Sequence, residues 1–248
     1  MDLTTFFKNN PKCALAFSGG VDSGYLLYAA CRQGAEVCAY YVKTAFQPQF
    51  ELEDALRLAK QLQVSIKVLS ADILDKQTVT ENPVDRCYYC KRIIFETIAR
   101  AADADGFKVL LDGTNASDQE ADRAGMRALR ELSVKSPLRE CGLTKERIRA
   151  LSKEAGLITW DKPAYACLAT RIQAGEQITA EKLNAVEQAE NYLFSLGFTD
   201  FRVRMTGMAA KLQIREEQLE KAVVNREKIV TELKKYFTSV LLDLEMRT

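Results

Sequence analysis

Short apolar runs alternate with amphipathic stretches along the first half of the chain. Residues 12–17 read KCALAF and end in a Ser-Gly-Gly turn, and apolar residues then recur with helical spacing. We expect strands at residues 12–17, 36–42, 64–70 and 107–115, and helices at residues 22–32, 52–62, 88–102 and 144–155. Strands that alternate with helices predict a parallel, doubly wound α/β sheet.

The last third of the chain has a different order of elements. We expect a helix at 180–196, strands at 201–205 and 209–214, a helix ending near 236 and a strand at 238–245. This order predicts a second, smaller α/β domain, so that the chain divides into residues 1–174 and 175–248. Residues 71–86 are polar and contain Pro83, which predicts a mobile loop over the site.

Composition and charge narrow the function classes. Of the 248 residues, 47% are hydrophobic and 28% are charged, which is typical of a globular protein. The net charge is +1 with both signs mixed along the chain, so we expect a small-molecule substrate and no nucleic acid or membrane partner. There is no signal peptide pattern and no apolar run long enough to span a bilayer, so we expect a cytoplasmic protein.

The segment SGGVDS joins the first expected strand to the first expected helix. Its glycines let the backbone approach a polyphosphate, and its N–H groups and the helix N-terminus favour an anion. The serine hydroxyls can donate further hydrogen bonds, and the aspartate can bind magnesium or fix the loop. The alternative is an ordinary strand-turn-helix connection. We expect ATP contacts from Ser18, Gly19, Gly20, Asp22 and Ser23.

A second polar segment follows the fourth expected strand. Open parallel sheets bind ligands beyond the carboxyl ends of their strands. We therefore expect further ATP contacts from Asp112, Gly113, Thr114 and Asn115. We expect the substrate side to include Asp118, Asp122 and Arg123.

The SGGVDS loop lacks the GK[ST] ending of P-loop NTPases. It resembles the pyrophosphatase-loop superfamily, whose members cleave ATP between the α- and β-phosphates and leave an adenylated substrate. That resemblance implies an adenine nucleotide alpha hydrolase-like fold that uses ATP and magnesium. The chemistry suits a chain without histidine, because a substrate carboxylate already carries its charge and needs no general base.

Three of the seven cysteines form a candidate site. Cys87 and Cys90 make a CYYC motif at the start of a helix, and Cys167 lies in a later loop. They could be a redox pair, half of a zinc site, or three ligands of an iron–sulfur cluster. We expect Cys13, Cys31 and Cys38 to be buried apolar residues and Cys141 to be a loop residue.

The chain resembles the ATP-dependent sacrificial sulfur transferases of the LarE family over nearly its whole length. The motifs that carry the resemblance are SGGVDS (18–23), NPVDRCYYCK (82–91), LDGTNASDQEADRAG (111–125), SPLRE (136–140), KPAYACLATRI (162–172) and LGFTDFRVR (196–204). The resemblance implies thiolation of pyridinium-3,5-biscarboxylic acid mononucleotide through an acyl adenylate. Members with all three cysteines are thought to hold a [4Fe-4S] cluster that carries a removable sulfide, so Cys87, Cys90 and Cys167 are expected to be catalytic ligands. An unidentified sulfide donor and a homo-oligomer are also expected.

Polar residues of the second domain complete the predicted site. Arg202 and Arg204 alternate on one expected strand and point to one face. The resemblance implies that, with Arg171, they bind the substrate's phosphate, whereas a solvated basic face is equally consistent with the pattern. Glu190, in EKLNAVEQAE, lies in the helix before the LGF turn and could reach the site, but we favour an exposed helix carboxylate. The segment MTGMAAKLQ lacks the histidine and glutamate often found in the family, and Gln213 cannot replace the glutamate's charge.

Three other functions compete with this interpretation. A tRNA-thiolating pyrophosphatase-loop enzyme would also combine the loop with cysteines, but it would be expected to carry a basic RNA-binding surface. An amidating synthetase, like those for NAD or GMP, would not need a CxxC motif. A non-catalytic zinc protein would have no function for the SGGVDS loop, which is predicted to bind ATP.

Overall fold

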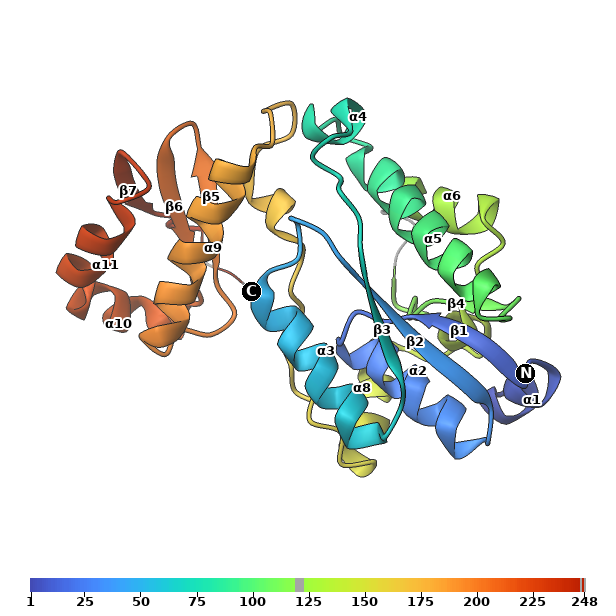
Figure 1. Cartoon of the computed structure of the whole chain (residues 1–248). Coiled ribbons are helices and arrows are strands. Elements are labelled where there is room, and N and C mark those ends of the chain that lie inside the picture. The colour runs from blue at the N-terminus through green and yellow to red at the C-terminus, as the bar shows by residue number, and fades with distance from the viewer. Residues whose placement is uncertain (119–122, 246, 248) are drawn as a thin grey trace. The chain divides into compact units, whose positions relative to one another are not determined.

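The expected strands of the first half form one parallel sheet (Figure 1). Among residues 1–118, 123–245 and 247, which the computed structural model describes, this sheet has four strands in the order β3-β2-β1-β4. The strands are β1 (Lys12–Ala16), β2 (Glu36–Lys43), β3 (Ile66–Ser70) and β4 (Leu110–Leu111). The parallel α/β fold predicted from the sequence is confirmed.

Helices cover both faces of this sheet. Leu15 and Phe17 belong to the buried cluster that includes Leu26 of α2 and Leu58 of α3. Ala14 directly precedes Leu15 in sequence and belongs to the cluster on the other face, with residues of α5. A continuous apolar run therefore supplies both cores, because successive strand residues point to opposite faces. The helices here are α1 (Leu3–Asn9), α2 (Val21–Arg32), α3 (Gln49–Leu62), α5 (Arg86–Ala104), α6 (Arg123–Glu131), α7 (Pro137–Glu140) and α8 (Lys145–Glu154).

β4 is shorter than the strand expected at 107–115. The N–H of Asp112 donates to the carbonyl of Lys135 at 3.0 Å, and the N–H of Lys135 donates to the carbonyl of Leu110 at 2.9 Å. The chain beyond Leu111 therefore pairs with the segment after α6. Three helices, α1, α6 and α7, were not expected, since they are short or lie in polar sequence.

Contacts divide the chain into two units at places that differ from the expected boundary. Unit 1 comprises Met1–Ile73 and Asp85–Lys162, and unit 2 comprises Leu74–Val84 and Pro163–Thr248. The side chain of Asn82 donates to the carbonyls of Ile172 and Gln173 at 3.3 and 2.7 Å. The N–H of Gly175 donates to the carbonyl of Asn82 at 2.8 Å. These bonds join the segment expected to be a mobile loop, which contains α4 (Gln77–Thr80), to unit 2.

Unit 2 is built on a mixed sheet with the order β5-β6-β7. β5 and β6 are antiparallel, and β6 and β7 are parallel. The elements are η2 (Leu168–Arg171), α9 (Ala180–Ser195), β5 (Arg202–Thr206), β6 (Ala209–Gln213), η3 (Glu216–Gln218), α10 (Leu219–Val224), α11 (Arg226–Leu233) and β7 (Ser239–Leu242). The single helix expected before residue 236 is thus interrupted at Asn225, which ends α10 and begins α11.

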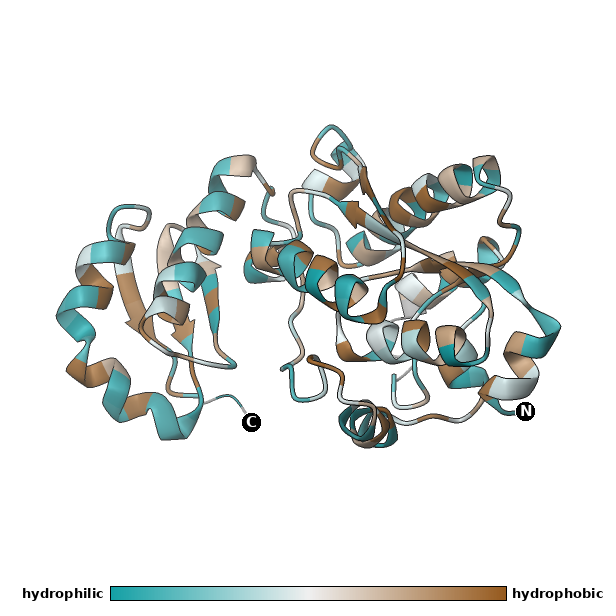
Figure 2. Cartoon of the chain, turned by 60° about the horizontal axis from the view of Figure 1, so that its bottom comes forward, coloured by the Kyte–Doolittle hydropathy of each residue, from teal (hydrophilic) through white to brown (hydrophobic). Residues whose placement is uncertain are grey.

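Apolar residues are concentrated on the strands and the inner helix faces (Figure 2). In the described part of the chain, none of the helices is both long enough and apolar enough to cross a bilayer.

Candidate active site

The predicted pyrophosphatase loop leaves β1 and enters α2 at the carboxyl end of the sheet. The Ser18 and Ser23 hydroxyls lie 3.0 Å apart, and the N–H of Ser18 donates to Ser23 Oγ at 3.3 Å. The N–H of Gly20 donates to Ser18 Oγ at 3.3 Å. Gly20 is the N-cap of α2 and has no side chain to cap the helix. The N–H groups of the first turn are therefore available to an anion.

Two glycines of the predicted site meet backbone atoms that leave no room for a side chain. Gly19 has φ +70°, and a Cβ there would lie 2.8 Å from Cα of Ala55 in α3. A Cβ on Gly113 would lie 2.9 Å from the backbone nitrogen of Ser23. The second approach brings the segment after β4 against the start of α2, at the carboxyl ends of the parallel strands.

Asp22 has one paired and one unpaired carboxylate oxygen. Its Oδ2 accepts a hydrogen bond from Nζ of Lys145 in α8 at 2.5 Å. Its Oδ1 is buried and has no hydrogen-bond partner among the residues that the structure describes. Burial raises the pKa of this carboxyl, and the hydrogen bond and charge of Lys145 oppose that rise. A buried carboxylate oxygen without a donor fits a magnesium ion, which prefers oxygen ligands.

Asp112 is buried at the end of β4, with an exposed fraction of 5%. Its Oδ1 accepts from the Ser136 hydroxyl at 2.6 Å, and its Oδ2 accepts from the Thr114 hydroxyl. Burial raises the pKa of this carboxyl, while the two hydroxyls and the charge of Lys91 act against the rise.

Cys87 and Cys90 lie in the first turns of α5, as predicted. Residues three apart share one side of a helix, so the spacing suits two ligands of one centre. Cys90 is 9% exposed and Cys87 is half-buried. The Arg86 guanidinium lies 3.9 Å from Sγ of Cys87 and 6.0 Å from the ring centroid of Phe46, which follows β2. The CYYC motif therefore lies at the carboxyl edge of the sheet in unit 1.

Cys167 belongs to unit 2, where it is half-buried and forms the N-cap of η2. The three predicted cluster ligands are thus divided between the two units. Within either unit, no three Asp, Glu or Cys side chains of residues 1–118, 123–245 and 247 are grouped as metal ligands. Thiolates are nevertheless the donors that iron–sulfur clusters require, so the residue types fit the group.

The three predicted arginines of unit 2 contact backbone carbonyls. Arg202 Nη2 donates to the carbonyl of Ala164 at 2.6 Å, and Arg204 Nη1 donates to that of Thr170 at 2.8 Å. Arg171 is 1% exposed, and its Nη1 donates to the carbonyl of Ala166 at 3.0 Å. Burial, together with the charge of Arg171, lowers the pKa of Arg202 to about 10.

The interpretation of Glu190 as an exposed helix carboxylate is wrong. Glu190 is 1% exposed and accepts hydrogen bonds from Arg171 at 2.7 and 3.2 Å. It also accepts from the N–H of Val203 at 2.9 Å and from the Tyr165 hydroxyl. Its place after Val186 and Ala189, on the apolar side of α9, was the available sequence signal.

Several other polar residues were predicted or missed. Asp118 Oδ2 accepts from the N–H of Asn115 at 2.8 Å, so it fixes the turn after β4. Asp122 lies outside the described residues, and so does the side chain of Arg123. Gln213 connects Arg204 to Asp243, accepting at 2.5 Å and donating at 2.7 Å. The sequence analysis did not predict that Lys91 and Lys145 act on Asp112 and Asp22. A lysine whose partner is distant in sequence has no local sequence pattern that identifies it.

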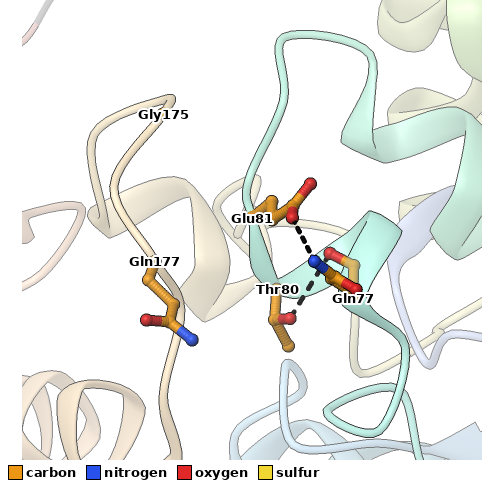
Figure 3. A pocket seen from close by; sticks show the side chains of 5 residues that line it. All are labelled: Gln77, Thr80, Glu81, Gly175 and Gln177. Carbon is orange, nitrogen blue, oxygen red and sulfur yellow. Dashed lines mark hydrogen bonds between the residues drawn. The ribbon is translucent and has the colours of Figure 1, made fainter.

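None of the predicted cysteines and arginines lines the pocket shown in Figure 3. This pocket of about 410 Å³ lies in unit 2, between α4 and the segment that holds Gly175 and Gln177. Its other lining residues are Gln77, Thr80 and Glu81, and Gln77 donates to Glu81 at 2.6 Å.

Comparisons with known proteins agree with this architecture. The family model described as queuosine biosynthesis protein QueC matches residues 12–85. An uncharacterised protein of Synechocystis is 35% identical, over 98% of this chain and 92% of the relative. The pyridinium-3,5-bisthiocarboxylic acid mononucleotide synthase of Lactiplantibacillus plantarum is 30% identical, over 98% of this chain and 89% of the relative. The tRNA-specific 2-thiouridylase MnmA of Thermotoga maritima is 26% identical, over 59% of this chain and 52% of the relative.

The fold and the glycine loop define a pyrophosphatase-loop enzyme that uses ATP in sulfur transfer. Because the similarity to the Lactiplantibacillus synthase extends over nearly the full length of both chains, this chain belongs to the LarE family. The resemblance to that family is confirmed. The iron–sulfur type and the individual site residues stay predictions.

Proposed function

We propose that the protein uses ATP to adenylate a carboxylate of pyridinium-3,5-biscarboxylic acid mononucleotide and then converts it to a thiocarboxylate. The observation that carries the proposal is the loop at Gly19, with the buried, unpartnered Oδ1 of Asp22 beside it. The substrate class is supported by the synthase of Lactiplantibacillus plantarum, whose name specifies the bisthiocarboxylic product.

Unit 1 would carry out the adenylation. A substrate carboxylate oxygen attacks the α-phosphorus, an O–P bond forms, and the bond to the bridging oxygen breaks, so that pyrophosphate leaves with the electron pair. The N–H groups at Gly19, Gly20 and the start of α2 would hold the leaving phosphates, and oriented donors of this kind stabilise developing charge. Asp22 would hold magnesium through Oδ1, with Lys145 fixing the other oxygen.

The cysteines would carry out the sulfur transfer. Cys87, Cys90 and Cys167 would ligate three irons of a [4Fe-4S] cluster, which supplies sulfide when bound. Attack of the sulfide on the acyl carbon of the adenylate forms a C–S bond and breaks the C–O bond to AMP, which leaves with the electron pair. The sulfide must be replaced after each turnover, so the proposal includes a separate sulfide donor.

In unit 2, Arg202 and Arg204 are the proposed contacts of the substrate phosphate. Arg204 is half-buried, whereas Arg171 is 1% exposed and engaged by Glu190. A phosphate would therefore reach Arg204 more readily than Arg171. We also propose that the protein is a cytoplasmic homo-oligomer. Its presence in the soluble fraction of a cell extract tests the localisation, and gel filtration of that fraction tests the assembly.

A second candidate is thiolation of tRNA, because the 2-thiouridylases match 59% of this chain. A tRNA enzyme is expected to present many cations to the RNA backbone. The chain has 35 Lys and Arg against 34 Asp and Glu, which disfavours that substrate. Transfer of labelled sulfur from the protein to tRNA would favour tRNA thiolation over thiolation of the mononucleotide.

The cysteine assignment is tested by iron and sulfide analysis of anaerobically purified protein. The proposal predicts about four iron and four sulfide per chain in the wild type. Cys87→Ala, Cys90→Ala and Cys167→Ala should each lose most of the iron, and Cys141→Ala should keep it. Bound zinc without iron would refute the cluster.

A further inference from the structure

The loop that carries Cys167 is held by guanidinium groups along its length. Arg202 donates to the carbonyl of Ala164, Arg171 to that of Ala166 and Arg204 to that of Thr170, at 2.6, 3.0 and 2.8 Å. Backbone carbonyls that accept from charged donors form stronger hydrogen bonds than those with neutral donors. These three contacts fix the backbone on both sides of the cysteine.

Arg171 is the member of this set that contacts the chain both before and after Cys167. Its Nη1 donates to the carbonyl of Ala166 and, at 2.8 Å, to the Thr170 hydroxyl. That hydroxyl in turn donates to the carbonyl of Cys167 at 2.8 Å. The orientation of the guanidinium thus determines where the peptide groups before and after the cysteine point.

Glu190 fixes the orientation of Arg171. The carboxylate accepts from Nε at 2.7 Å and from Nη2 at 3.2 Å, a two-point contact that sets the plane of the guanidinium. The N–H of Val203 and the Tyr165 hydroxyl hold the carboxylate itself. The Tyr165 ring also packs against Arg171 and Arg202, with centroid distances of 4.6 and 5.2 Å.

We propose that Glu190 is a positioning residue, which acts through Arg171 to hold the Cys167 thiol in the orientation needed for sulfur transfer. The part that concerns sulfur transfer rests on the proposed function, and the part that concerns the thiol does not. Glu190 itself touches no reacting atom in this proposal.

The first test removes the pair while keeping the fold. Replacement of a buried ion pair by apolar residues of similar size is often neutral for stability, whereas removal of one partner is not. The double variant Arg171→Met/Glu190→Leu should therefore lose less stability than either single variant. Tyr165→Phe is a milder second variant, because it removes one hydrogen bond to Glu190 and keeps the ring.

The readout is the rate at which iodoacetamide alkylates each cysteine of the full-length, aerobically purified protein, followed by peptide mass spectrometry. Cys87 in unit 1 is the internal reference, and Cys13, which is fully buried, reports global unfolding. We expect the rate at Cys167, relative to Cys87, to rise at least threefold in the double variant and about twofold in Tyr165→Phe. Cys13 should stay unmodified. An unchanged ratio in both variants, or a rise at Cys13 that accompanies the rise at Cys167, would overturn the positioning role.

A second readout separates this inference from the proposed function. If the wild type transfers sulfur, the double variant should lose at least tenfold in kcat with an unchanged KM for ATP, because the nucleotide loop lies in unit 1. Wild-type protein that transfers no sulfur would refute the proposed function, and the alkylation ratio would still decide the positioning of Cys167.

Discussion

Asp22 and Lys145 are joined at 2.5 Å, and the bond uses only one of the two carboxylate oxygens. The other oxygen, Oδ1, is buried without a hydrogen-bond partner among the described residues. Buried polar atoms in native proteins are almost always paired, and those that are not call for an ion, a water or a ligand. The pair lies at the start of α2, where the phosphates of ATP are expected.

Replacement of Asp22 by asparagine should lower AMP release about 100-fold or more, because the amide removes the negative charge offered to magnesium. The magnesium concentration needed for half-maximal rate should rise as well. Both quantities are measured by coupled detection of pyrophosphate over a magnesium series. Asp105→Asn is the matched control, since Asp105 also pairs with a lysine, Lys67, at 2.6 Å, away from the loop. Equal losses in the two variants would contradict the role of Asp22.

Gly19→Ala should abolish tight ATP binding. The new Cβ would lie 2.8 Å from Cα of Ala55 in α3, which is backbone and cannot rotate away. Gly34→Ala is the control for strain alone, because Gly34 has the same φ of +70° and a Cβ there would meet nothing within 4 Å. Gly34→Ala should lose about 1 kcal/mol of stability from its positive φ alone, and Gly19→Ala should lose more because the clash adds to the same strain. Only Gly19→Ala should weaken ATP binding more than tenfold, measured by calorimetry. Equal ATP affinities of the two variants would refute the role of the glycine loop in binding ATP.

Asp112→Asn should make the protein more stable relative to wild type as the pH rises from about 4 to 7. Burial raises the folded-state pKa of Asp112 above its unfolded value. Such a group contributes stability below its unfolded pKa and loses that contribution as the pH rises through its folded pKa, whereas asparagine does not titrate. Urea unfolding of both proteins across this range gives the difference. A difference that shrinks as the pH rises would mean that the hydroxyls of Ser136 and Thr114 outweigh burial.

Asp105→Asn should show the opposite pH trend. The hydrogen bonds from Lys67 and Tyr40 lower the pKa of Asp105, so its contribution is present above its unfolded pKa and is lost as the pH falls. Urea unfolding of this variant over the same pH range therefore serves as the control, since its stability relative to wild type should fall as the pH rises.

Cys13 should resist alkylation in the native protein at pH 8. Burial raises the pKa of this thiol to about 12, so the thiolate fraction would be about 10⁻⁴, roughly a thousandfold below that of an ordinary cysteine. Fast modification at pH 8 in folded protein would contradict the placement of Cys13 in the core.

The sheet was predictable because its signal is local. The apolar run at 12–17 and the SGGVDS turn after it specify a buried strand and a phosphate loop without reference to distant residues. Cys13 and Cys38 were likewise placed correctly in strands and in the core. The meeting of Gly113 with Ser23 followed from parallel pairing, which brings the carboxyl ends of neighbouring strands together.

The parts that could not be predicted depend on pairings between segments far apart in sequence. Glu190 lies on the apolar side of α9, but the local pattern does not show that Arg171 and Val203 are its partners. Residues 74–84 belong to unit 2 because Asn82 binds the carbonyls of Ile172 and Gln173. A polar segment gives no local sign of which distant carbonyls it will contact.

The central claim is that the glycine loop directs attack at the α-phosphate of ATP. The most direct measurement is to incubate the protein with magnesium, ATP labelled at the α-phosphate and the biscarboxylic mononucleotide, and to separate the labelled products. We predict labelled AMP with an equal amount of pyrophosphate, formed only when the mononucleotide is present. Labelled ADP, with release of inorganic phosphate, would contradict the claim.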